Sequence, residues 1–336
     1  MRVLVTGGGG FLGSHIVDAL LRRGLEAKVA GRHRYPHIEA KGVEISVGDL
    51  ADSESALRAV DGCDAVIHTA AIPGIGVNDE AYRRSNIVAT ENVIKAAHAH
   101  GVRRLVFTSS PSVVHDGHSI KGGDETLPYP ARYLTAYART KAEAEKAILA
   151  ANGESLSTCA IRPHLVFGPG DAQLIPKLLA RARAGRLAQV GNGRNMISIC
   201  YVENAADAHS LALNALAPGG KAAGQAYFVN EPDPVNCWEF INRIVTGAGL
   251  SKITRRVPYP LAYAAGWACE TAYSLFRAKA DPPLTRFLVS QLATSHWFKI
   301  DKARRDLGWE PAVSLDEGVR RFLDSIKKSR TESSTG

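Results

Sequence analysis

The first half of the chain alternates short apolar runs with longer stretches in which apolar residues recur at helical spacing. The short runs predict buried strands at residues 2–6, 27–30, 43–47, 65–68, 105–107 and 158–161. The longer stretches predict helices, among them residues 12–23, 79–100 and 134–151. Repeated strand–helix units predict an α/β fold, a doubly wound parallel sheet with helices on both faces.

The pattern changes after residue 170. Helical segments are expected near residues 174–184, 235–248, 261–276, 283–293 and 315–327, joined by turns rich in Pro and Gly. We interpret them as a smaller, mostly helical C-terminal lobe. The expected organisation is a nucleotide-binding domain over residues 1–167 with later returns near 195–230. A substrate lobe over 168–328 and a frayed polar tail over 329–336 would follow.

The composition of the 336 residues, with 45% hydrophobic and 22% charged residues, is that of an ordinary globular protein and excludes wholesale disorder. The longest stretch without a charged residue covers residues 3–17 and is shorter than the about 20 residues that span a bilayer. The chain enters its first strand directly after Met1-Arg2, so we expect no signal peptide.

The net charge of +8 comes from basic residues that occur mostly in scattered pairs, such as Arg22-Arg23 and Arg255-Arg256. No basic arm stands out, so we expect no nucleic-acid partner; an anionic small ligand or a negative membrane surface explains the charge as well. The five cysteines are odd in number and never spaced C-x-x-C. We therefore expect no disulfide framework, no metal centre and a reducing, cytoplasmic location.

Four consecutive glycines lie between the first strand and the first helix, where the backbone of such folds approaches a pyrophosphate. Two registers fit the spacing, one beginning at Gly7 and one at Gly8; both continue through Gly10 and Gly13. The order of strand, loop and helix favours a dinucleotide site over a simple tight turn.

The end of the second predicted strand indicates which dinucleotide is preferred. NAD sites usually carry an acid about 20 residues beyond the glycines, but here Gly31 and Arg32 occupy that place. A guanidinium suits a 2′-phosphate, so NADP(H) is favoured over NAD(H), unless Arg32 is only a solvated loop residue. Asp49, after the third strand, is placed to approach the adenine.

Tyr137 and Lys141 are four residues apart on a predicted helix and leave the same face. Ser109 and Ser110 follow the fifth strand, at the sheet edge where ligands bind. An ammonium beside a tyrosine favours tyrosinate, and a serine hydroxyl could hold a substrate oxygen. The three residue types together predict proton transfer to or from a carbonyl or alcohol.

At this point the sequence resembles the extended short-chain dehydrogenases/reductases, whose fold is a Rossmann sheet. The resemblance spans nearly the whole chain and rests on Thr6-Gly7-x-x-Gly10-x-x-Gly13, Asp49-Leu50, His68-Thr-Ala-Ala71, Phe107-Thr-Ser-Ser110, Tyr137-x-x-x-Lys141, Arg162-Pro163 to Phe167-Gly-Pro169, Tyr201-Val202-x-Asn204-Ala205 and Leu307-Gly-Trp-x-Pro311. Residues 109–114, 124–129 and 283–287 look most like the 3β-hydroxysteroid dehydrogenase branch. Bacterial 2-alkyl-3-oxoalkanoate reductases and sterol-4-carboxylate 3-dehydrogenases are similar in the same segments.

The resemblance implies residue roles. Tyr137 would be the proton donor or acceptor, Lys141 would bond the nicotinamide ribose, Ser110 would orient the carbonyl, and Asn86 would match the family's Asn on the preceding helix. Further expected cofactor contacts are Phe11, Leu12, Leu50, Ala70 and Pro163.

Four residues are candidates for substrate contact: Ser112, His164, Arg194 and Trp267. His164 follows the strand that should reach the nicotinamide, with simple packing as its alternative. Arg194 could meet a carboxylate or lie in a surface turn. Trp267 belongs to an apolar segment that is either buried in the lobe or a lid over the active-site mouth, admitting a lipid-like chain from a membrane surface.

The expected activity is an NADP(H)-dependent oxidoreductase that interconverts a ketone and a secondary alcohol on a hydrophobic substrate. The resemblance favours reduction of a 2-alkyl-3-oxoalkanoate to the 3-hydroxy acid. A 3β-hydroxysteroid or sterol-4-carboxylate dehydrogenase, an NAD-dependent nucleotide-sugar epimerase and a redox-sensing regulator remain alternatives. We expect a homodimer with peripheral contact to a membrane or lipid.

Overall fold

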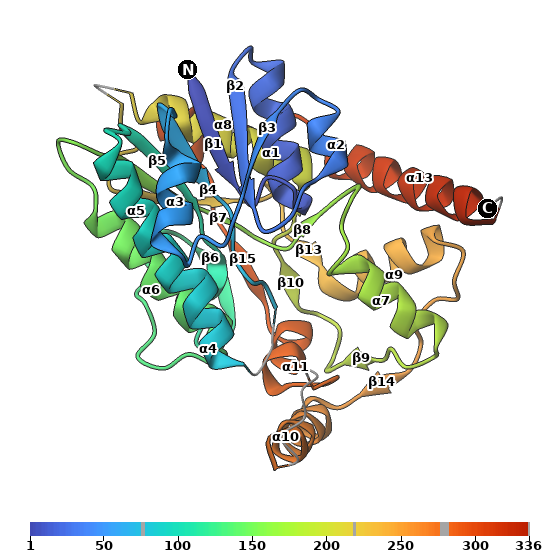
Figure 1. The fold of residues 1–336 in the computed structure, drawn as a ribbon. Coiled ribbons are helices and arrows are strands. Elements are labelled where there is room, and N and C mark those ends of the chain that lie inside the picture. Colours follow the sequence, from blue (N-terminus) through green and yellow to red (C-terminus); the bar gives the residue numbers. More distant parts are fainter. Residues whose placement is uncertain (75–77, 218–219, 276–281, 335–336) are drawn as a thin grey trace.

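A computed structural model describes residues 1–74, 78–217, 220–275 and 282–334. Seven strands form one parallel sheet in the order β12–β7–β5–β4–β1–β2–β3 (Figure 1). They are β1 (Arg2–Thr6), β2 (Glu26–Gly31), β3 (Glu44–Val47), β4 (Ala65–His68), β5 (Arg104–Thr108), β7 (Ser157–Pro163) and β12 (Gln225–Val229). The predicted doubly wound sheet is confirmed, and all its carboxyl ends meet at one edge.

Helices cover both faces because successive strand residues point to opposite sides. Val3 and Val5 of β1 belong to the core beneath α1 (Phe11–Arg22), α8 (Val202–Ala215) and α12 (Asp301–Leu307). Leu4 belongs to the core beneath α3 (Ser53–Val60), α5 (Ala89–Ala99) and α6 (Ala136–Ala150). The short helix α2 (Pro36–Glu39) lies between β2 and β3.

The predicted helix over residues 79–100 is not uniform. It begins as α4 (Asp79–Tyr82), continues as a π-helical segment, η1 (Arg83–Val88), and ends as α5. A π-bulge adds a residue to the helical turn and is frequent at functional sites. In this protein it carries Asn86 and Arg84, two residues of the candidate site.

The lobe contains more strand than the sequence predicted. Short strands β6 (Ile120–Gly123), β10 (Met196–Ile197), β13 (Val235–Asn236) and β15 (His296–Phe298) form a second sheet in the order β13–β10–β15–β6. Two further pairs join β8 (Val166–Phe167) to β11 (Cys200–Tyr201) and β9 (Gln189–Val190) to β14 (Arg256–Val257). The lobe helices are α7 (Ile175–Arg183), α9 (Cys237–Gly247), α10 (Tyr259–Leu275), α11 (Arg286–Ala293) and α13 (Leu315–Ser334), which continues beyond its predicted end near residue 327.

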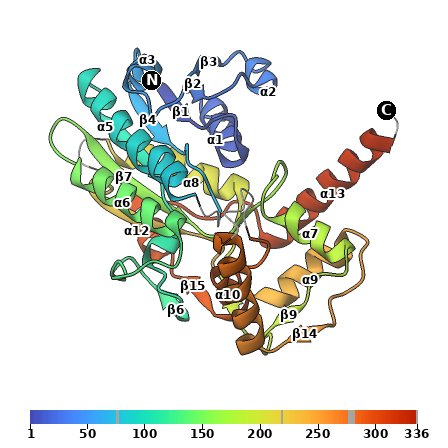
Figure 2. The same cartoon turned by 60° about the horizontal axis from the view of Figure 1, so that its bottom comes forward.

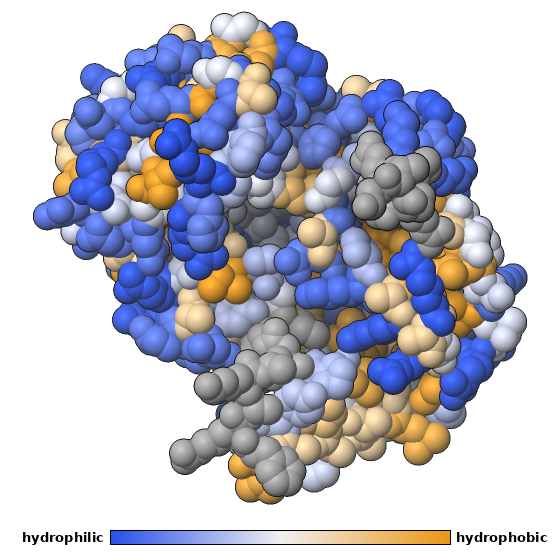
Figure 3. Space-filling view, turned by 45° about the vertical axis from the view of Figure 1, so that its right-hand side comes forward, coloured by the Kyte–Doolittle hydropathy of each residue, from blue (hydrophilic) through white to orange (hydrophobic). Residues whose placement is uncertain are grey.

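Helix α10 lies at the outer end of the lobe in both ribbon views (Figure 2). Its large apolar side chains are exposed: Leu261 by 65%, Trp267 by 55% and Leu275 by 75%. The opposite face packs against the lobe core through Ala262 and Tyr263. Helix α10 is therefore buried on one face and exposed on the other, and its part as a lid stays a prediction. In the space-filling view the surface is hollowed between the large sheet and the lobe, with apolar side chains at the lower end (Figure 3). Among the described residues, no helix is both long and apolar enough to cross a membrane.

Candidate active site

The glycine loop closes tightly at the carboxyl end of β1. Gly7 has a φ of +67°, a conformation that favours glycine, and a Cβ on Gly13 would lie 2.2 Å from the Gly7 carbonyl oxygen. A Cβ on Gly10 would lie 3.2 Å from the same oxygen. Gly10 and Gly13 belong to both registers, and a Cβ on Gly8 would lie 2.6 Å from Val29 Cγ2. The structure therefore requires glycine at Gly7, for its positive φ, and has no room for a Cβ at Gly8, so the choice of register stays a prediction. Helix α1 begins at Phe11, so the loop leaves a bare backbone at a helix N-terminus, which fits a pyrophosphate.

The residues predicted to bind the adenosine end of the cofactor follow β2 and β3 in the sequence. Arg32 is exposed at the end of β2, and Asp49 accepts a bond of 2.8 Å from Arg84. Burial would raise the pKa of Asp49, but bonds from the Ala51 N–H and from Arg84 hold it below its usual value. Asp49 therefore stays charged and its side chain is engaged by a guanidinium that the sequence analysis did not select.

A second unpredicted residue, Tyr35, packs against the glycine loop. A Cβ on Gly9 would lie 2.2 Å from the Tyr35 ring, and a Cβ on Gly31 would lie 2.6 Å from its ring edge and hydroxyl. Tyr35 therefore packs closely against both the glycine loop and the end of β2, where a larger residue at Gly9 or Gly31 would displace its ring.

The neighbouring backbone is fixed by Thr6, whose hydroxyl accepts from the Ala70 N–H at 3.1 Å and contacts His68 Nδ1 at 2.7 Å. Burial lowers the pKa of His68 to about 3, so the ring is neutral. Leu50 and Pro163 are buried, while Phe11 and Leu12 are partly buried behind the loop. All these predicted cofactor contacts lie at or near the carboxyl edge of the sheet.

Tyr137 lies in the first turn of α6, which begins after Thr135, whose side chain accepts from the Ala138 N–H. The Ser110 hydroxyl accepts from the Ser112 N–H at 3.2 Å and lies near the Tyr137 phenol. Burial raises the pKa of Tyr137, and the nearby Ser110 hydroxyl acts in the opposite direction. The structure thus brings the predicted tyrosine and serine together, with the protonated phenol favoured before a ligand binds.

Lys141 lies one turn further along α6 and is only 3% exposed. Its ammonium donates to the Thr108 carbonyl and lies 3.9 Å from the centre of the Phe107 ring. Burial lowers the pKa of Lys141 to about 7, although Glu145 opposes the change. Lys141 therefore gains or loses its proton close to neutral pH, because burial disfavours the charged form.

Beneath Lys141, Glu145 and Arg162 form a fully buried, two-pronged ion pair, with Nε–Oε2 and Nη2–Oε1 distances of 2.9 and 2.6 Å. Tyr129 donates to the same carboxylate at 2.6 Å. Although burial would raise the pKa of Glu145, the bonds from Arg162 hold it below its usual value. None of these three residues is a predicted site residue, although Glu145 lies one turn after Lys141.

Asn86 is buried but does not reach Tyr137 or Lys141 through any bond of its own. Its Oδ1 accepts from the Ile72 N–H at 2.8 Å, and its Nδ2 donates to Thr140 Oγ1 at 3.1 Å. The side chain therefore ties the segment after β4 to the helix that carries Tyr137. This geometry is that of a positioning residue; a catalytic part for Asn86 stays a prediction.

The sequence of the chain matches a family model described as "3-beta hydroxysteroid dehydrogenase/isomerase family" over residues 4–260. The match covers the glycine loop, Ser110, Tyr137 and Lys141. The chain belongs to this family. The expected resemblance to this branch of the extended short-chain dehydrogenases/reductases is confirmed, and this family member is an oxidoreductase.

Two curated relatives cover almost the whole family member. A 2-alkyl-3-oxoalkanoate reductase of Stenotrophomonas maltophilia is 46% identical, over 97% of this chain and 99% of the relative. A decarboxylating sterol-4-alpha-carboxylate 3-dehydrogenase of Mus musculus is 34% identical, over 98% and 92%. A UDP-glucose 4-epimerase of Thermus thermophilus, solved with NAD, shares the fold with a TM-score of 0.72, 27% identity and coverage of 97% and 99%.

The predicted substrate residues of this family member lie in three different places. Ser112 and His164 are at the carboxyl edge of the sheet, and Ser112 Oγ is buried without a hydrogen-bond partner among the described residues. Arg194 is exposed in a turn, and Trp267 is exposed on α10. Contact of Arg194 or Trp267 with a substrate stays a prediction.

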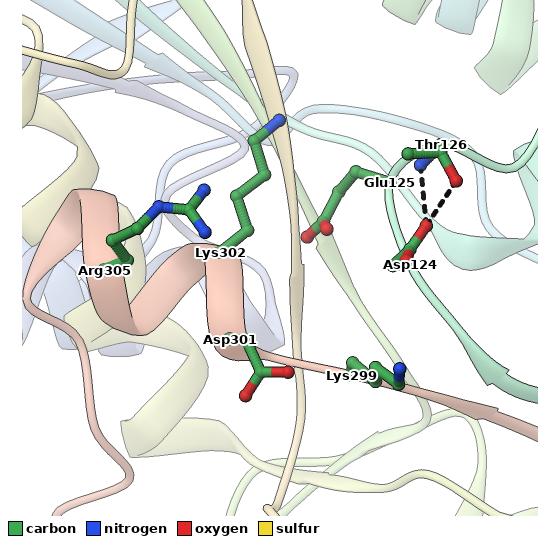
Figure 4. A pocket seen from close by; sticks show the side chains of 7 residues that line it. All are labelled: Asp124, Glu125, Thr126, Lys299, Asp301, Lys302 and Arg305. Carbon is green, nitrogen blue, oxygen red and sulfur yellow. Dashed lines mark hydrogen bonds between the residues drawn. The ribbon is translucent and has the colours of Figure 1, made fainter.

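A separate cavity of about 390 Å³ contains none of the predicted site residues (Figure 4). It is lined by Asp124, Glu125, Thr126, Lys299, Asp301, Lys302 and Arg305. Cations and carboxylates are mixed there, and Asp124 is already engaged by Thr126. The cavity therefore does not compete with the Tyr137 centre as the site of chemistry.

Proposed function

We propose that this protein is an NADP(H)-dependent reductase that converts a 2-alkyl-3-oxoalkanoate into the 3-hydroxy acid. The observation that carries the proposal is the placement of Ser110, Tyr137 and Lys141 at the sheet edge beside a glycine loop shaped for a pyrophosphate. The substrate class is taken from the relative that is 46% identical over nearly the full length of both chains.

The residues of the site divide the work. Ser110 holds the ketone oxygen, and Tyr137 gives that oxygen its proton as the alcohol forms. Lys141, when protonated, stabilises the tyrosinate that remains. NADP(H), held by the glycine loop and the residues around it, supplies hydride chemistry when bound. The overall change is ketone plus NADPH plus one proton to secondary alcohol plus NADP⁺.

The preference for the phosphorylated cofactor is supported by Arg32, which is exposed at the end of β2 where an acid would favour NAD. Arg32→Asp should weaken NADPH relative to NADH about tenfold or more, which corresponds to about 1.4 kcal/mol. Dissociation constants for both cofactors measure this ratio, with Arg34→Asp as the control because Arg34 is paired with Glu39. An unchanged ratio would argue that Arg32 is only a solvated residue.

Contact with a lipid surface is the second part of the proposal. The exposed Leu261, Trp267 and Leu275 of α10 give an apolar face. Arg181 of α7 donates to the Pro283 carbonyl close to α11, which packs against α10. Apolar and aromatic side chains beside cations suit an anionic interface. Trp267→Glu should reduce co-sedimentation with anionic vesicles, whereas Leu57→Glu, on the sheet helix α3, should not.

The substrate assignment is tested by NADPH oxidation with 2-alkyl-3-oxoalkanoates, 3-oxo sterols and nucleotide sugars in parallel. Reduction of the oxo acids with the highest kcat/KM supports the proposal. A preference for the sterols would replace it by the activity of the relatives that are 34% identical. Interconversion of nucleotide sugars without net cofactor consumption would reject it. The predicted homodimer is tested separately by light scattering.

A further inference from the structure

Three histidines from distant parts of the chain meet beside the Ser110 segment. His164 follows β7, His296 lies in β15, and His115 follows the short 3₁₀ helix η2 (Pro111–Val114). The His164 and His296 ring centres are 4.9 Å apart, and those of His115 and His296 are 6.2 Å apart. Within the described part of the chain, no group of three or more His, Cys, Asp or Glu converges as metal ligands. A metal site of that kind therefore does not explain why the three rings lie together.

The hydrogen bonds determine which nitrogens carry protons. His296 Nε2 lies 2.8 Å from the Gln291 carbonyl, which can only accept, so this nitrogen donates. In the neutral ring His296 Nδ1 must then accept, and its partner at 2.7 Å, His164 Nε2, must donate. His164 Nδ1 is thus left without a proton, as the basic nitrogen of the pair.

His164 is held at the reacting edge of the sheet. The Ser109 N–H donates to the Ile161 carbonyl at 2.6 Å, which fixes the end of β7 beside the segment that carries Ser110. The next residue, Leu165, has a φ of +43°, a strained conformation for a residue with a branched side chain. Such strain is concentrated at functional sites. The His164 N–H also donates to the Val229 carbonyl at 3.3 Å, so the backbone at His164 is held to β12.

His115 adds unused polar groups to the same place. It is 4% exposed, and neither ring nitrogen has a hydrogen-bond partner among the described residues. The Oγ of Ser112 is buried and unpartnered in the same segment. Leaving buried polar groups unsatisfied costs free energy, so a ligand that satisfies them gains it back. The cluster therefore contains hydrogen-bonding atoms to which no group in the described part of the protein bonds.

We propose that His164, positioned by His296, binds the carboxylate of the 3-oxo acid and takes up a proton from solvent as it does so. The proposal rests on the proposed function, which supplies the carboxylate. A protonated His164 donates from Nδ1 to the carboxylate and from Nε2 to His296. The hydrogen bonds from His164 through His296 to the Gln291 carbonyl therefore stay unchanged when the proton binds. This proton stays on the ring and is separate from the one that Tyr137 gives to the ketone.

The ionisable groups that face His164 are His296 and His115. Burial, followed by these two rings, keeps the pKa of free His164 well below its usual value of 6.5. A bound carboxylate favours the charged ring and raises that pKa. Between the two pKa values, the carboxylate binds less tightly as the pH rises, by up to about tenfold per pH unit.

The test compares a 2-alkyl-3-hydroxyalkanoate with the same secondary alcohol lacking the carboxylate, both oxidised with NADP⁺. This direction avoids the spontaneous decarboxylation of 3-oxo acids. His164→Gln should lower kcat/KM for the hydroxy acid roughly 30-fold or more, mainly through KM. The plain alcohol should change less than about threefold. His296→Gln should act in the same direction, and His118→Gln, on an exposed residue, should change neither.

Calorimetry of hydroxy-acid binding to the cofactor-free protein, in buffers of different ionisation enthalpy, measures the proton directly. The parent should take up a proton near neutral pH and His164→Gln should not. The same uptake in both, or equal losses on both alcohols, would overturn the inference. If neither alcohol is oxidised the proposed function fails, whereas the calorimetry still decides the carboxylate site.

Discussion

The two sides of the Tyr137 centre are built on opposite principles. On the sheet side, Lys141, Glu145 and Arg162 are buried ionisable groups that bond to protein partners, and only Arg162 Nη1 among their polar atoms lacks one within the described residues. On the lobe side, His115 is buried with both ring nitrogens unpartnered among the described residues, and α10 presents apolar side chains to solvent. The charged groups of the sheet side bond to other groups of the protein. Polar and apolar groups of the lobe side remain available to a ligand.

This difference indicates a division of labour. Buried charges that are fully paired hold one geometry, because removing any partner leaves an expensive unpaired charge. Unpaired donors and exposed apolar surface stabilise the protein little, but they are available to a ligand. The sheet side should therefore determine which reaction occurs, and the lobe side which molecule undergoes it.

The largest effect should come from Tyr137→Phe, which removes the proton donor and keeps the ring. Turnover should fall about 10²- to 10⁴-fold on every substrate, the usual contribution of general acid–base catalysis. Cofactor affinity should stay close to that of the parent. Tyr133→Phe is the matched control, because Tyr133 bonds only weakly to the Val113 carbonyl, at 3.4 Å. A loss of turnover with only one substrate would mean that Tyr137 selects the substrate and does not catalyse the reaction.

Glu145→Gln should produce the next largest effect, on stability. It leaves Arg162 charged and buried without its carboxylate, which costs about 3 kcal/mol or more. Denaturant unfolding measures the loss. Glu143→Gln, on the same helix, breaks only an exposed pair with Arg139 and should cost less than about 1 kcal/mol. Equal losses in both variants would contradict the role assigned to the buried pair.

Lys141→Met should abolish turnover yet stabilise the cofactor-free protein. The pKa of Lys141 is about 7 in the folded protein against an ordinary value of 10.5, so the unfolded chain binds the proton more tightly between these values. In the parent, the loss of folding stability caused by Lys141 is complete below pH 7 and disappears as the pH approaches 10.5. The variant's advantage in free energy of unfolding should shrink over that range, whereas Lys146→Met, on an exposed residue, should show no such trend.

On the lobe side, Trp267→Glu should give the smallest effect and the most selective one. Each buried CH₂ contributes about 0.8 kcal/mol, close to fourfold, so kcat/KM should rise with the alkyl chain of the substrate. The variant should flatten this rise while leaving the shortest substrate unchanged. A chain-length series with parent, Trp267→Glu and Leu57→Glu measures it. If the kcat/KM of the parent does not depend on the length of the alkyl chain, α10 takes no part in substrate binding.

The sheet side could be predicted from the sequence because its signals are local. The glycines, the strand ends and the four-residue spacing of Tyr137 and Lys141 each lie within one turn or one loop. The positive φ of Gly7 and the close approach of Val29 to Gly8 depend on the folded backbone, and no spacing reveals them.

The lobe side could not be predicted in the same way because its groups come together only through tertiary structure. His115 and His296 are separated by most of the chain, and the sequence around His115 is typical of a solvated loop. The same reason applies to part of the sheet side: Arg162 is in a sequence motif, but its partner Glu145 lies on a different element. The short strands of the second sheet are too brief to show a period of two. The π-helical turn at Asn86 has no sequence pattern that distinguishes it from an ordinary helix.

The strand order has a consequence for synthesis of the chain. β12 pairs with β7, yet about 60 residues separate them in the sequence. At roughly 5–20 residues per second, a ribosome makes that segment in roughly 3–12 s. During this interval the apolar strand β7 is an open edge, able to pair with another nascent chain. The order in which the gene encodes the strands therefore leaves this edge of the sheet unpaired for several seconds after β7 has been made.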